Sequence, residues 1–314
     1  METKVSAGVR NTGPSSSTGR ASALPAVPDR PRAVEAALRR LGVEPSRDLG
    51  QSFLVNRFAA DALAALAEPA SGRPMIEIGG GLGIVTRALL DRGVRDLTVV
   101  ERDRRLADHL TSTFGRAVTV RCADARRFDF PREVTVVGSL PYASATTIVL
   151  ELLQRRVRRI AVVLQKEVAE RFAAEPGSRV YGRPSILARL YGDPELLREI
   201  GPEAFYPAPR VASRLWAHTA RDGPLPVRSV IRLETVVRRL FASRRKQLGN
   251  LLPQFARDRA DAEQLARRAA WPDGWTRLRP EQLAPEAFFR LATTLEGRIP
   301  EQTQRSPRRE PDGG

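Results

Sequence analysis

A short apolar strand that runs into a glycine-rich turn is the feature that most constrains the fold of this chain. The strand is predicted over Pro74–Ile78, and glycines then occupy positions 79, 80, 81 and 83 before a helix begins at Ile84. Glycine is favoured where the backbone passes close to a ligand or adopts angles closed to other residues. Because such a turn is a weak signal in isolation, its meaning depends on the pattern around it.

Helices alternate with short apolar strands from Ser46 to about residue 174. Further strands are predicted over Leu97–Val100, Val118–Cys122, Val134–Val137 and Ile160–Leu164, and helices over 33–42, Phe58–Leu66, Ile84–Arg92, Arg104–Phe114, Thr146–Leu153 and 166–174. This alternation predicts an α/β fold with a parallel sheet covered on both faces. After about Gly223 only helices are predicted, over Val230–Ser243, Gln247–Ala256, Ala260–Ala270 and Pro285–Leu295, so we expect a small C-terminal α-helical domain.

Charge and composition narrow the class of protein further. The 314 residues include 52 Lys and Arg against 36 Asp and Glu, a net charge of +16. A surplus of this size indicates a polyanionic partner, with nucleic acid as the first candidate. One cysteine excludes an internal disulfide, and with two histidines it leaves no Cys/His metal cluster. No apolar run reaches the roughly 18 residues needed to cross a bilayer, so we expect a cytoplasmic protein without a metal or a membrane partner.

Several isolated residues that could carry chemistry are better explained by packing or solvation. Cys122 ends a predicted strand and is expected to be a buried core thiol. His109 follows Asp108 in a helix and is expected to be solvated. The three tryptophans are expected to anchor the core, at positions Trp216, Trp271 and Trp275.

Acidic residues follow the second and third predicted strands, where they can complete a nucleotide site with the glycine turn. Glu101 ends the second strand, where a carboxylate can bind a ribose diol. Asp124 and Ala125 follow the third strand, where a carboxylate can accept a hydrogen bond from an adenine amino group. A dinucleotide site favours G-x-G-x-x-G, whereas the spacing here is G-x-G-x-G, which favours S-adenosylmethionine (SAM). The predicted cofactor residues are therefore Gly79, Gly81, Gly83, Glu101, Asp124 and Ala125.

The fourth predicted strand ends in a loop that resembles the signature of amino-methyltransferases. This loop is Gly138-Ser139-Leu140-Pro141-Tyr142, where such enzymes carry (Asn/Asp/Ser)-(Pro/Leu)-Pro-(Tyr/Phe). Around it, six motifs occur in the order found in the rRNA adenine N6,N6-dimethyltransferase family. They are Gly50–Leu54 (G-Q-N-F-L in the family), Glu77–Gly83 (E-I-G-P-G-x-G), Gln165–Ala169 (Q-K-E-V-A), Pro176–Gly182 (P-G-S-x-x-Y-G), Phe205–Val211 (F-x-P-x-P-K-V) and Arg244–Asn250 (R-R-K-x-L-x-N).

The chain from Asp48 to about Leu295 resembles this family, and the small-subunit branch more than the macrolide-resistance branch. The resemblance implies a Rossmann-like class I SAM-dependent methyltransferase that methylates N6 of adenine in ribosomal RNA, with one or two methyl groups and with antibiotic resistance as a possible outcome. It implies that Ser139 and the Leu140 carbonyl accept hydrogen bonds from the N6 amine, while Pro141 stiffens their loop. Tyr142 and Phe205 would stack on the two faces of the base. The first motif would add Gln51, Ser52 and Leu54 to the cofactor site, which Ser139 also borders.

Three residues differ from the usual family pattern. Serine replaces asparagine at Ser52 and Ser139, and Gly80 replaces a proline, which should loosen the glycine turn. A serine hydroxyl accepts a hydrogen bond but reaches roughly 1–2 Å less far than an amide. These changes keep two alternatives open. One is an N-methyltransferase for a small natural-product amine, and the other is a non-catalytic rRNA-binding assembly factor.

The expected organisation has four parts. Residues 1–45 form a disordered basic arm with a short helix, 46–222 the methyltransferase domain, 223–300 a helical RNA-binding domain and 301–314 a disordered tail. The expected partner is ribosomal RNA or a ribosomal subunit precursor, and we expect the protein to act as a monomer. Basic pairs and triplets in the last third, such as Arg238-Arg239 and Arg244-Arg245-Lys246, are expected to contact RNA.

Overall fold

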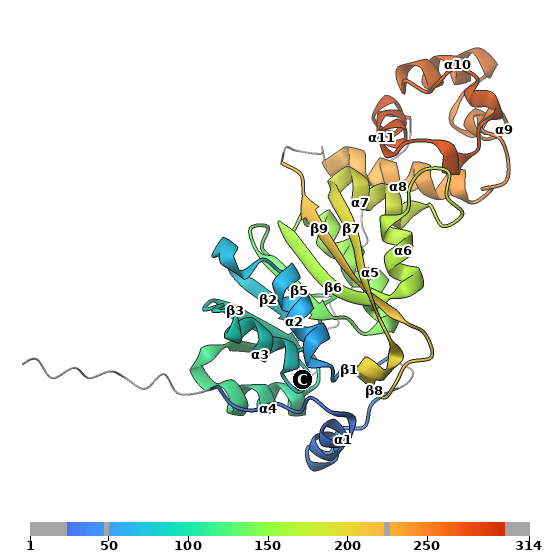
Figure 1. The fold of residues 1–314 in the computed structure, drawn as a ribbon. Coiled ribbons are helices and arrows are strands. Elements are labelled where there is room, and N and C mark those ends of the chain that lie inside the picture. The colour runs from blue at the N-terminus through green and yellow to red at the C-terminus, as the bar shows by residue number, and fades with distance from the viewer. Residues whose placement is uncertain (1–23, 47–49, 223–226, 299–314) are drawn as a thin grey trace, which may run out of the picture.

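The computed structural model describes residues 24–46, 50–222 and 227–298, and a seven-stranded sheet forms its centre (Figure 1). The strand order is β4-β3-β2-β5-β6-β9-β7. The first five of these strands are parallel. Their bounds are Thr119–Cys122 (β4), Leu97–Glu101 (β3), Met75–Ile78 (β2), Thr135–Ser139 (β5) and Arg159–Gln165 (β6). The predicted α/β fold is confirmed, and each predicted strand is present within two residues of its expected ends.

The prediction of a wholly parallel sheet is wrong at one edge. β9 (Ser213–Ala220) runs antiparallel to β6, and β7 (Gly192–Ile200) runs antiparallel to β9. β7 is the outer strand, and most of its residues are exposed or half-buried, so its sequence GDPELLREI lacks the apolar run of an internal strand. Because of this polar composition, no strand is predicted there from the sequence.

Helices cover both faces of the sheet because alternate strand residues point to opposite sides. Val137 belongs to the buried cluster that includes side chains of α2 and α3, whereas its neighbour Val136 belongs to the cluster under α5, α6 and α7. The bounds are Arg57–Leu66 (α2), Ile84–Asp91 (α3), Arg104–Phe114 (α4), Tyr142–Gln154 (α5), Lys166–Ala173 (α6) and Arg183–Tyr191 (α7).

Among the described residues, four α-helices follow β9, at Val227–Phe241 (α8), Leu248–Leu251 (α9), Arg259–Arg268 (α10) and Pro285–Thr294 (α11). The predicted helix over Gln247–Ala256 is wrong in extent, because α9 ends at Leu251 and a short 3₁₀ helix continues to Phe255 with Pro253 inside it. The buried cluster under α5–α7 continues into α8 and α11. Within the described residues, no helix is long and apolar enough to span a membrane.

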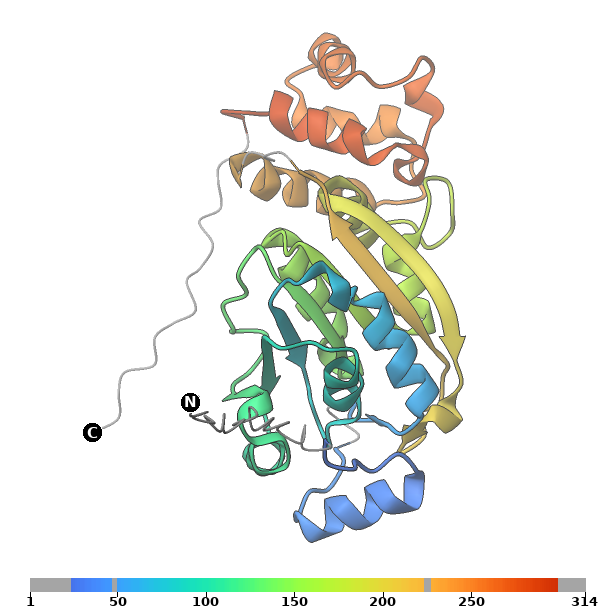
Figure 2. The same cartoon turned by 60° about the vertical axis from the view of Figure 1, so that its left-hand side comes forward.

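The N-terminal part of the described chain lies at the other end of the molecule from α9–α11 (Figure 2). Helix α1 (Pro31–Arg40) packs its apolar side chains against Leu82 and Leu106 of the main fold. Next to it, β1 (Phe53–Leu54) pairs antiparallel with β8 (Phe205–Tyr206) in a separate two-stranded sheet. Two motifs that are about 150 residues apart in the sequence are thereby joined.

Two of the expectations for isolated residues are wrong, and the one for tryptophan is confirmed. Cys122 is exposed, because β4 is an edge strand that presents most of its side chains to solvent. His109 is half-buried rather than solvated, and burial lowers the pKa of its imidazole. Trp216 and Trp271 are buried, and Trp275 packs against the same core.

Candidate functional site

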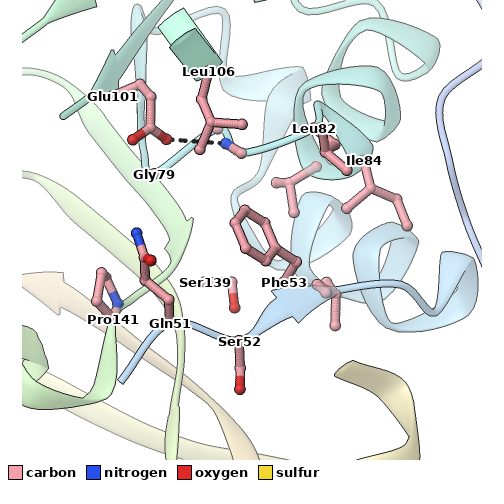
Figure 3. Close-up of a pocket in the computed structure, with 14 residues that line it drawn as sticks. Gln51, Ser52, Phe53, Gly79, Leu82, Ile84, Glu101, Leu106, Ser139 and Pro141 are labelled. Carbon is pink, nitrogen blue, oxygen red and sulfur yellow. Dashed lines mark hydrogen bonds between the residues drawn. The ribbon is translucent and has the colours of Figure 1, made fainter. Parts of the chain in front are cut away.

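A pocket opens where β2, β3 and β5 end, at the carboxyl edge of the parallel strands (Figure 3). This is where open α/β sheets bind their ligands. Polar groups come from the glycine turn, Glu101, Gln51, Ser52 and Ser139, and apolar side chains form the walls. The full lining is Gln51, Ser52, Phe53, Leu54, Gly79, Gly80, Gly81, Leu82, Ile84, Val85, Glu101, Leu106, Ser139 and Pro141.

The glycine turn adopts a backbone that few other residues tolerate. Gly79, Gly81 and Gly83 have φ values of 73°, 54° and 90°, all in the left-handed region. A Cβ on Gly81 would also lie 3.1 Å from the Phe53 ring. The turn therefore exposes backbone to the pocket, as a nucleotide-type ligand requires. Gly83 is not among the lining residues; it precedes α3 as its N-cap.

Glu101 points into the pocket and braces the glycine turn. The Gly81 N–H donates to its Oε2 at 3.1 Å, and the Asp103 N–H donates to its Oε1 at 3.0 Å. The hydrogen bond to Gly81 is drawn in Figure 3. Burial raises the pKa of the carboxyl, while these backbone donors oppose the rise. Each carboxylate oxygen can accept a second hydrogen bond, so the group can bind a diol without releasing the turn.

Gly80 is packed too closely for a larger residue. An added Cβ would lie 2.5 Å from Val99 Cγ1 and 2.8 Å from Leu110 Cδ1, so side chains from β3 and α4 fill the space that the family proline would need. The expected loosening of the turn stays a prediction.

We expect Gly80→Ala to lower the free energy of unfolding by about 1–3 kcal/mol, because overpacked cores strain their neighbours. The double variant Gly80→Ala/Val99→Ala should lose at least about 1 kcal/mol less than the sum of the losses in the two single variants. Urea denaturation of the three variants measures this difference. Strict additivity of the two changes, within about 0.5 kcal/mol, would contradict the packing explanation.

Glu77 lies beneath the pocket, buried in β2 and 1% exposed. Thr86 Oγ1 donates to its Oε2 at 2.6 Å. Burial raises the pKa of Glu77 to about 7, which the Thr86 hydrogen bond opposes and nearby Glu101 supports. The native protein therefore holds this proton at a pH where the unfolded chain has lost it.

An acid whose pKa is higher in the native state than in the unfolded chain stabilises the fold. This stabilisation is complete at a pH below the pKa of the unfolded chain, and it is lost as the pH rises through the pKa of the native state. Between pH 5 and 8, the free energy of unfolding of the wild type should fall by about 2 kcal/mol relative to Glu77→Gln. Urea titrations of the ligand-free proteins across this range measure the difference. Parallel curves for the two proteins would show that Glu77 does not titrate there.

The first motif packs directly against the loop after β5. Gly50 has a φ of 61°, and a Cβ there would lie 3.0 Å from both Tyr142 Cβ and the Ala143 nitrogen, so only glycine fits this contact. Gln51 lines the pocket while its Oε1 accepts from the Ser46 N–H at 2.9 Å. Ser52 also lines the pocket, and its hydroxyl donates to the Pro207 carbonyl at 2.8 Å. The serine thus holds the β8 segment to the pocket wall.

The loop after β5 brings Ser139 and Pro141 to the pocket lining. Ser139 is half-buried, and the Leu140 side chain is buried at 2% exposure, which anchors the loop. Among the described residues, no backbone N–H donates to the Leu140 carbonyl oxygen. Tyr142 is half-buried, and its hydroxyl lies 2.6 Å from Ser213 Oγ, which fixes its ring at the start of α5.

Six predicted site residues lie outside the pocket lining, namely Gly83, Asp124, Ala125, Leu140, Tyr142 and Phe205. Phe205 is 2% exposed and packed in the core. Asp124 accepts from the backbone and side chain of Arg126, with an Arg126 Nη2–Oδ2 distance of 2.5 Å, and Ala125 is buried beside it. The roles assigned to Phe205, Asp124 and Ala125 stay predictions.

Of the apolar walls of the pocket, Leu54 was predicted from the sequence and most of the other side chains were not. Phe53, Leu82 and Leu106 line it and also pack with α1, so the N-terminal helix supports one wall. Phe53 and Leu82 lie within recognised motifs, which was the available signal. Leu106 lies in α4, and nothing in its local sequence distinguishes it from an ordinary core leucine.

Two of the family motifs hold the C-terminal helices instead of lining the pocket. Tyr181 is buried, and its hydroxyl donates to the Leu283 carbonyl at 3.1 Å. Arg244 Nη2 donates to the Ser178 carbonyl at 3.0 Å. The loop over Pro176–Gly182 is therefore tied to the segments before α9 and α11. Among the described residues, no group of His, Cys, Asp and Glu could hold a metal ion.

Comparison with known proteins places this geometry in a family. The model for ribosomal RNA adenine dimethylase matches residues 44–270. Ribosomal RNA small subunit methyltransferase A of Hahella chejuensis is 38% identical over 265 residues, which cover 80% of this chain and 93% of the relative.

Two solved structures match over 78% of this chain. A dimethyladenosine transferase from Plasmodium falciparum, 19% identical, has a TM-score of 0.63 over 98% of its own chain and supports the fold. The 23S rRNA methyltransferase ErmE, 27% identical, has a TM-score of 0.58 over 99% of its chain. The extent of the family match and of the Hahella relative decides the assignment: the chain belongs to the ribosomal RNA adenine dimethylase family.

Proposed function

We propose that this protein transfers methyl groups from SAM to the N6 amine of an adenine in small-subunit ribosomal RNA. One observation carries the proposal: a single pocket brings together the glycine turn, Glu101 and the Ser139-Leu140-Pro141 loop. The first two suit a nucleoside cofactor and the third suits an amine. The family and the small-subunit relatives supply the class of RNA.

The residues that line the pocket suit SAM. Left-handed glycines leave open the cradle that side chains would fill, and the Glu101 carboxylate faces it as an acceptor for ribose hydroxyls. Apolar side chains from Leu82 and Leu106 provide walls for an adenine ring. When bound, SAM supplies an electrophilic methyl group on its sulfonium, and Gly79, Gly81, Glu101 and Gln51 are the residues we assign to holding it.

The loop after β5 would orient the amine. An adenine N6 lone pair is delocalised into the ring, so acceptors that bind its N–H groups favour a more pyramidal and nucleophilic nitrogen. We assign these roles to Ser139 Oγ and the Leu140 carbonyl. Pro141 restricts the backbone that aims that carbonyl. With the methyl donor and the amine both positioned, orientation supplies most of the rate and no strong base is needed. The Tyr142 ring is our candidate to stack on the extruded base.

We assign residues 46–222 to methyl transfer and 223–300 to RNA binding. Four of the five predicted basic residues are exposed, namely Arg238, Arg239, Arg245 and Lys246. Arg244 is instead committed to the Ser178 carbonyl and to Glu281, at 3.5 Å. The net charge of +16 supports a polyanionic substrate, whose binding should weaken steeply with salt.

The test is methylation of ribosomal RNA with labelled SAM. Undermethylated small subunits should incorporate label into adenine, and nucleoside analysis then counts one or two methyl groups. Label in large subunits alone would identify the target as 23S rRNA, the RNA that ErmE is named for. Antibiotic resistance would then be the expected outcome of methylation. No label in either subunit, from protein that binds SAM, would refute the proposal. Activity on a small amine that is insensitive to salt would support the natural-product alternative.

A further inference from the structure

A second pocket, formed by the C-terminal helices, carries an excess of positive charge. It is lined by Arg239, Gln254, Phe255, Ala256, Arg257 and Arg298. We propose that this arginine pocket binds a phosphodiester group of the ribosomal RNA backbone, as a holding point separate from the pocket where methyl transfer occurs. The inference rests on the proposed function, because it names how the same RNA substrate is gripped.

Arg239 extends from the exposed side of α8 and is oriented by an aromatic ring. Its Cζ lies 5.6 Å from the centroid of the Phe255 ring, within the range of a cation–π contact. None of the ion pairs between described residues involves Arg239. Its charge is therefore not neutralised, and the ring limits the freedom that binding would have to remove.

Arg257 and Arg298 converge on one buried carboxylate. Arg298 forms a two-point contact with Asp261, at 2.5 Å (Nη1–Oδ2) and 3.0 Å (Nη2–Oδ1). Arg257 Nε lies 3.5 Å from Oδ2, and its backbone N–H also donates there at 3.0 Å. The Arg298 guanidinium first, and then the Arg257 N–H, hold the pKa of Asp261 well below its usual range, so it stays ionised.

Charge and exposure indicate the ligand. Arg257 and Arg298 share the Asp261 carboxylate, whose side chain is only 3% exposed, whereas Arg239 pairs with no carboxylate among the described residues. Arg257 is 81% exposed as a side chain, so its remaining N–H donors face solvent. Fixed, exposed guanidinium forks match the oxygens of a phosphate.

Other arginines in these helices show the contrast. Arg232 is buried at 3% exposure and pairs with Glu296 at 3.2 Å, and Arg244 is bound to a backbone carbonyl. Those two side chains serve the fold. The arginine pocket is where concave shape and surplus charge coincide.

The test compares Arg239→Ala and Arg257→Ala with Arg259→Ala as a matched control. Arg259 is 95% exposed and pairs loosely with Glu263 at 3.7 Å on the surface of α10, so its removal deletes the same charge without touching the pocket. Each pocket variant should weaken binding to a small-subunit RNA fragment by roughly tenfold. It should also reduce the slope of log affinity against log salt by about 1. The SAM affinity of both pocket variants should be unchanged.

Two outcomes would overturn the proposal. One is a loss of RNA affinity in Arg259→Ala equal to that in the pocket variants, and the other is unchanged RNA affinity in both pocket variants. A free phosphate site would instead show thermal stabilisation by millimolar inorganic phosphate that Arg239→Ala abolishes while RNA affinity stays the same. Arg257→Lys, which keeps the charge but not the fork, should bind RNA with intermediate affinity and guards against a folding defect. If the wild type methylates ribosomal RNA but the pocket variants bind normally, only this inference fails and the proposed function stands.

Discussion

Replacing Glu101 by glutamine should weaken SAM binding by roughly 100-fold while leaving the fold intact. The carboxylate is buried at the pocket edge, holds the Gly81 N–H at 3.1 Å and keeps acceptor capacity for two ribose hydroxyls. Glutamine presents one acceptor and a donor that faces the Gly81 or Asp103 N–H. The expected loss therefore combines a charge-assisted hydrogen bond with an unsatisfied buried donor, each costing about 1–3 kcal/mol.

Isothermal titration with SAM measures this loss, and Asp103→Asn is the matched control. Asp103 lies two residues away, accepts from the Arg105 N–H at 2.9 Å as the N-cap of α4, and does not line the pocket. An asparagine keeps the cap, so its SAM affinity should be close to wild type. If Glu101→Gln binds SAM as tightly as Asp103→Asn does, the assignment of Glu101 is wrong.

The pH dependence of the same titration adds a second readout. Burial raises the pKa of Glu101, so the carboxylate gains a proton earlier than an ordinary glutamate as pH falls. A protonated acid has one acceptor fewer. SAM affinity of the wild type should therefore decrease on acidification, and that of Glu101→Gln should not follow it.

Glu101 illustrates what sequence can predict about such a site. The residue ends a strand whose apolar run is easily recognised, and parallel strands place their carboxyl ends at one edge. The glycine turn follows the neighbouring strand, so the contact between Gly81 and Glu101 follows from topology. For the same reason Ser139, at the end of the next strand, reaches the same pocket.

The pocket walls, and the surroundings of the residues predicted to bind adenine, depend on contacts that no local sequence pattern indicates. Leu106 reaches the pocket because α4 packs beside the turn, and α1 reaches Leu82 through side chains more than 40 residues away in the chain. Asp124 was predicted from its strand end, but its pairing with Arg126 depends on side-chain conformation. Phe205 was assigned from a motif, and its burial depends on how β8 meets β1.

The antiparallel edge of the sheet shows a different limit. β7 pairs with one partner only and exposes many polar side chains, so neither apolar alternation nor a continuous run indicates a strand. The Gly80 packing has the same character. A proline-to-glycine change suggests a loss of rigidity in the sequence, whereas the side chains of Val99 and Leu110 that leave no room for a larger residue come from two other elements.

The largest effect on catalysis is expected at Ser139. Ser139→Ala removes the side-chain oxygen proposed to accept from the N6 amine, so kcat/KM for small-subunit RNA should fall by roughly 10²- to 10³-fold, the range for a single positioned polar group. Because the Leu140 carbonyl and Pro141 are unchanged, the variant should still bind RNA. Single-turnover methylation with saturating SAM separates this chemical loss from any change in cofactor affinity. Ser112→Ala, an exposed serine of α4 whose hydroxyl donates to the His109 carbonyl, controls for the loss of a hydroxyl elsewhere.

Ser139→Asn decides what the natural serine means. The longer amide would reach roughly 1–2 Å farther into the pocket and could accept the same N6 hydrogen bond. If serine is a working substitute, wild type and Ser139→Asn should both methylate RNA, with rates within about tenfold of each other. Methylation that appears only in Ser139→Asn would instead identify the natural protein as an rRNA-binding factor. The Ser52 hydroxyl holds the Pro207 carbonyl, so we assign the side-chain acceptor for the amine to position 139, and this pair of variants tests that assignment directly.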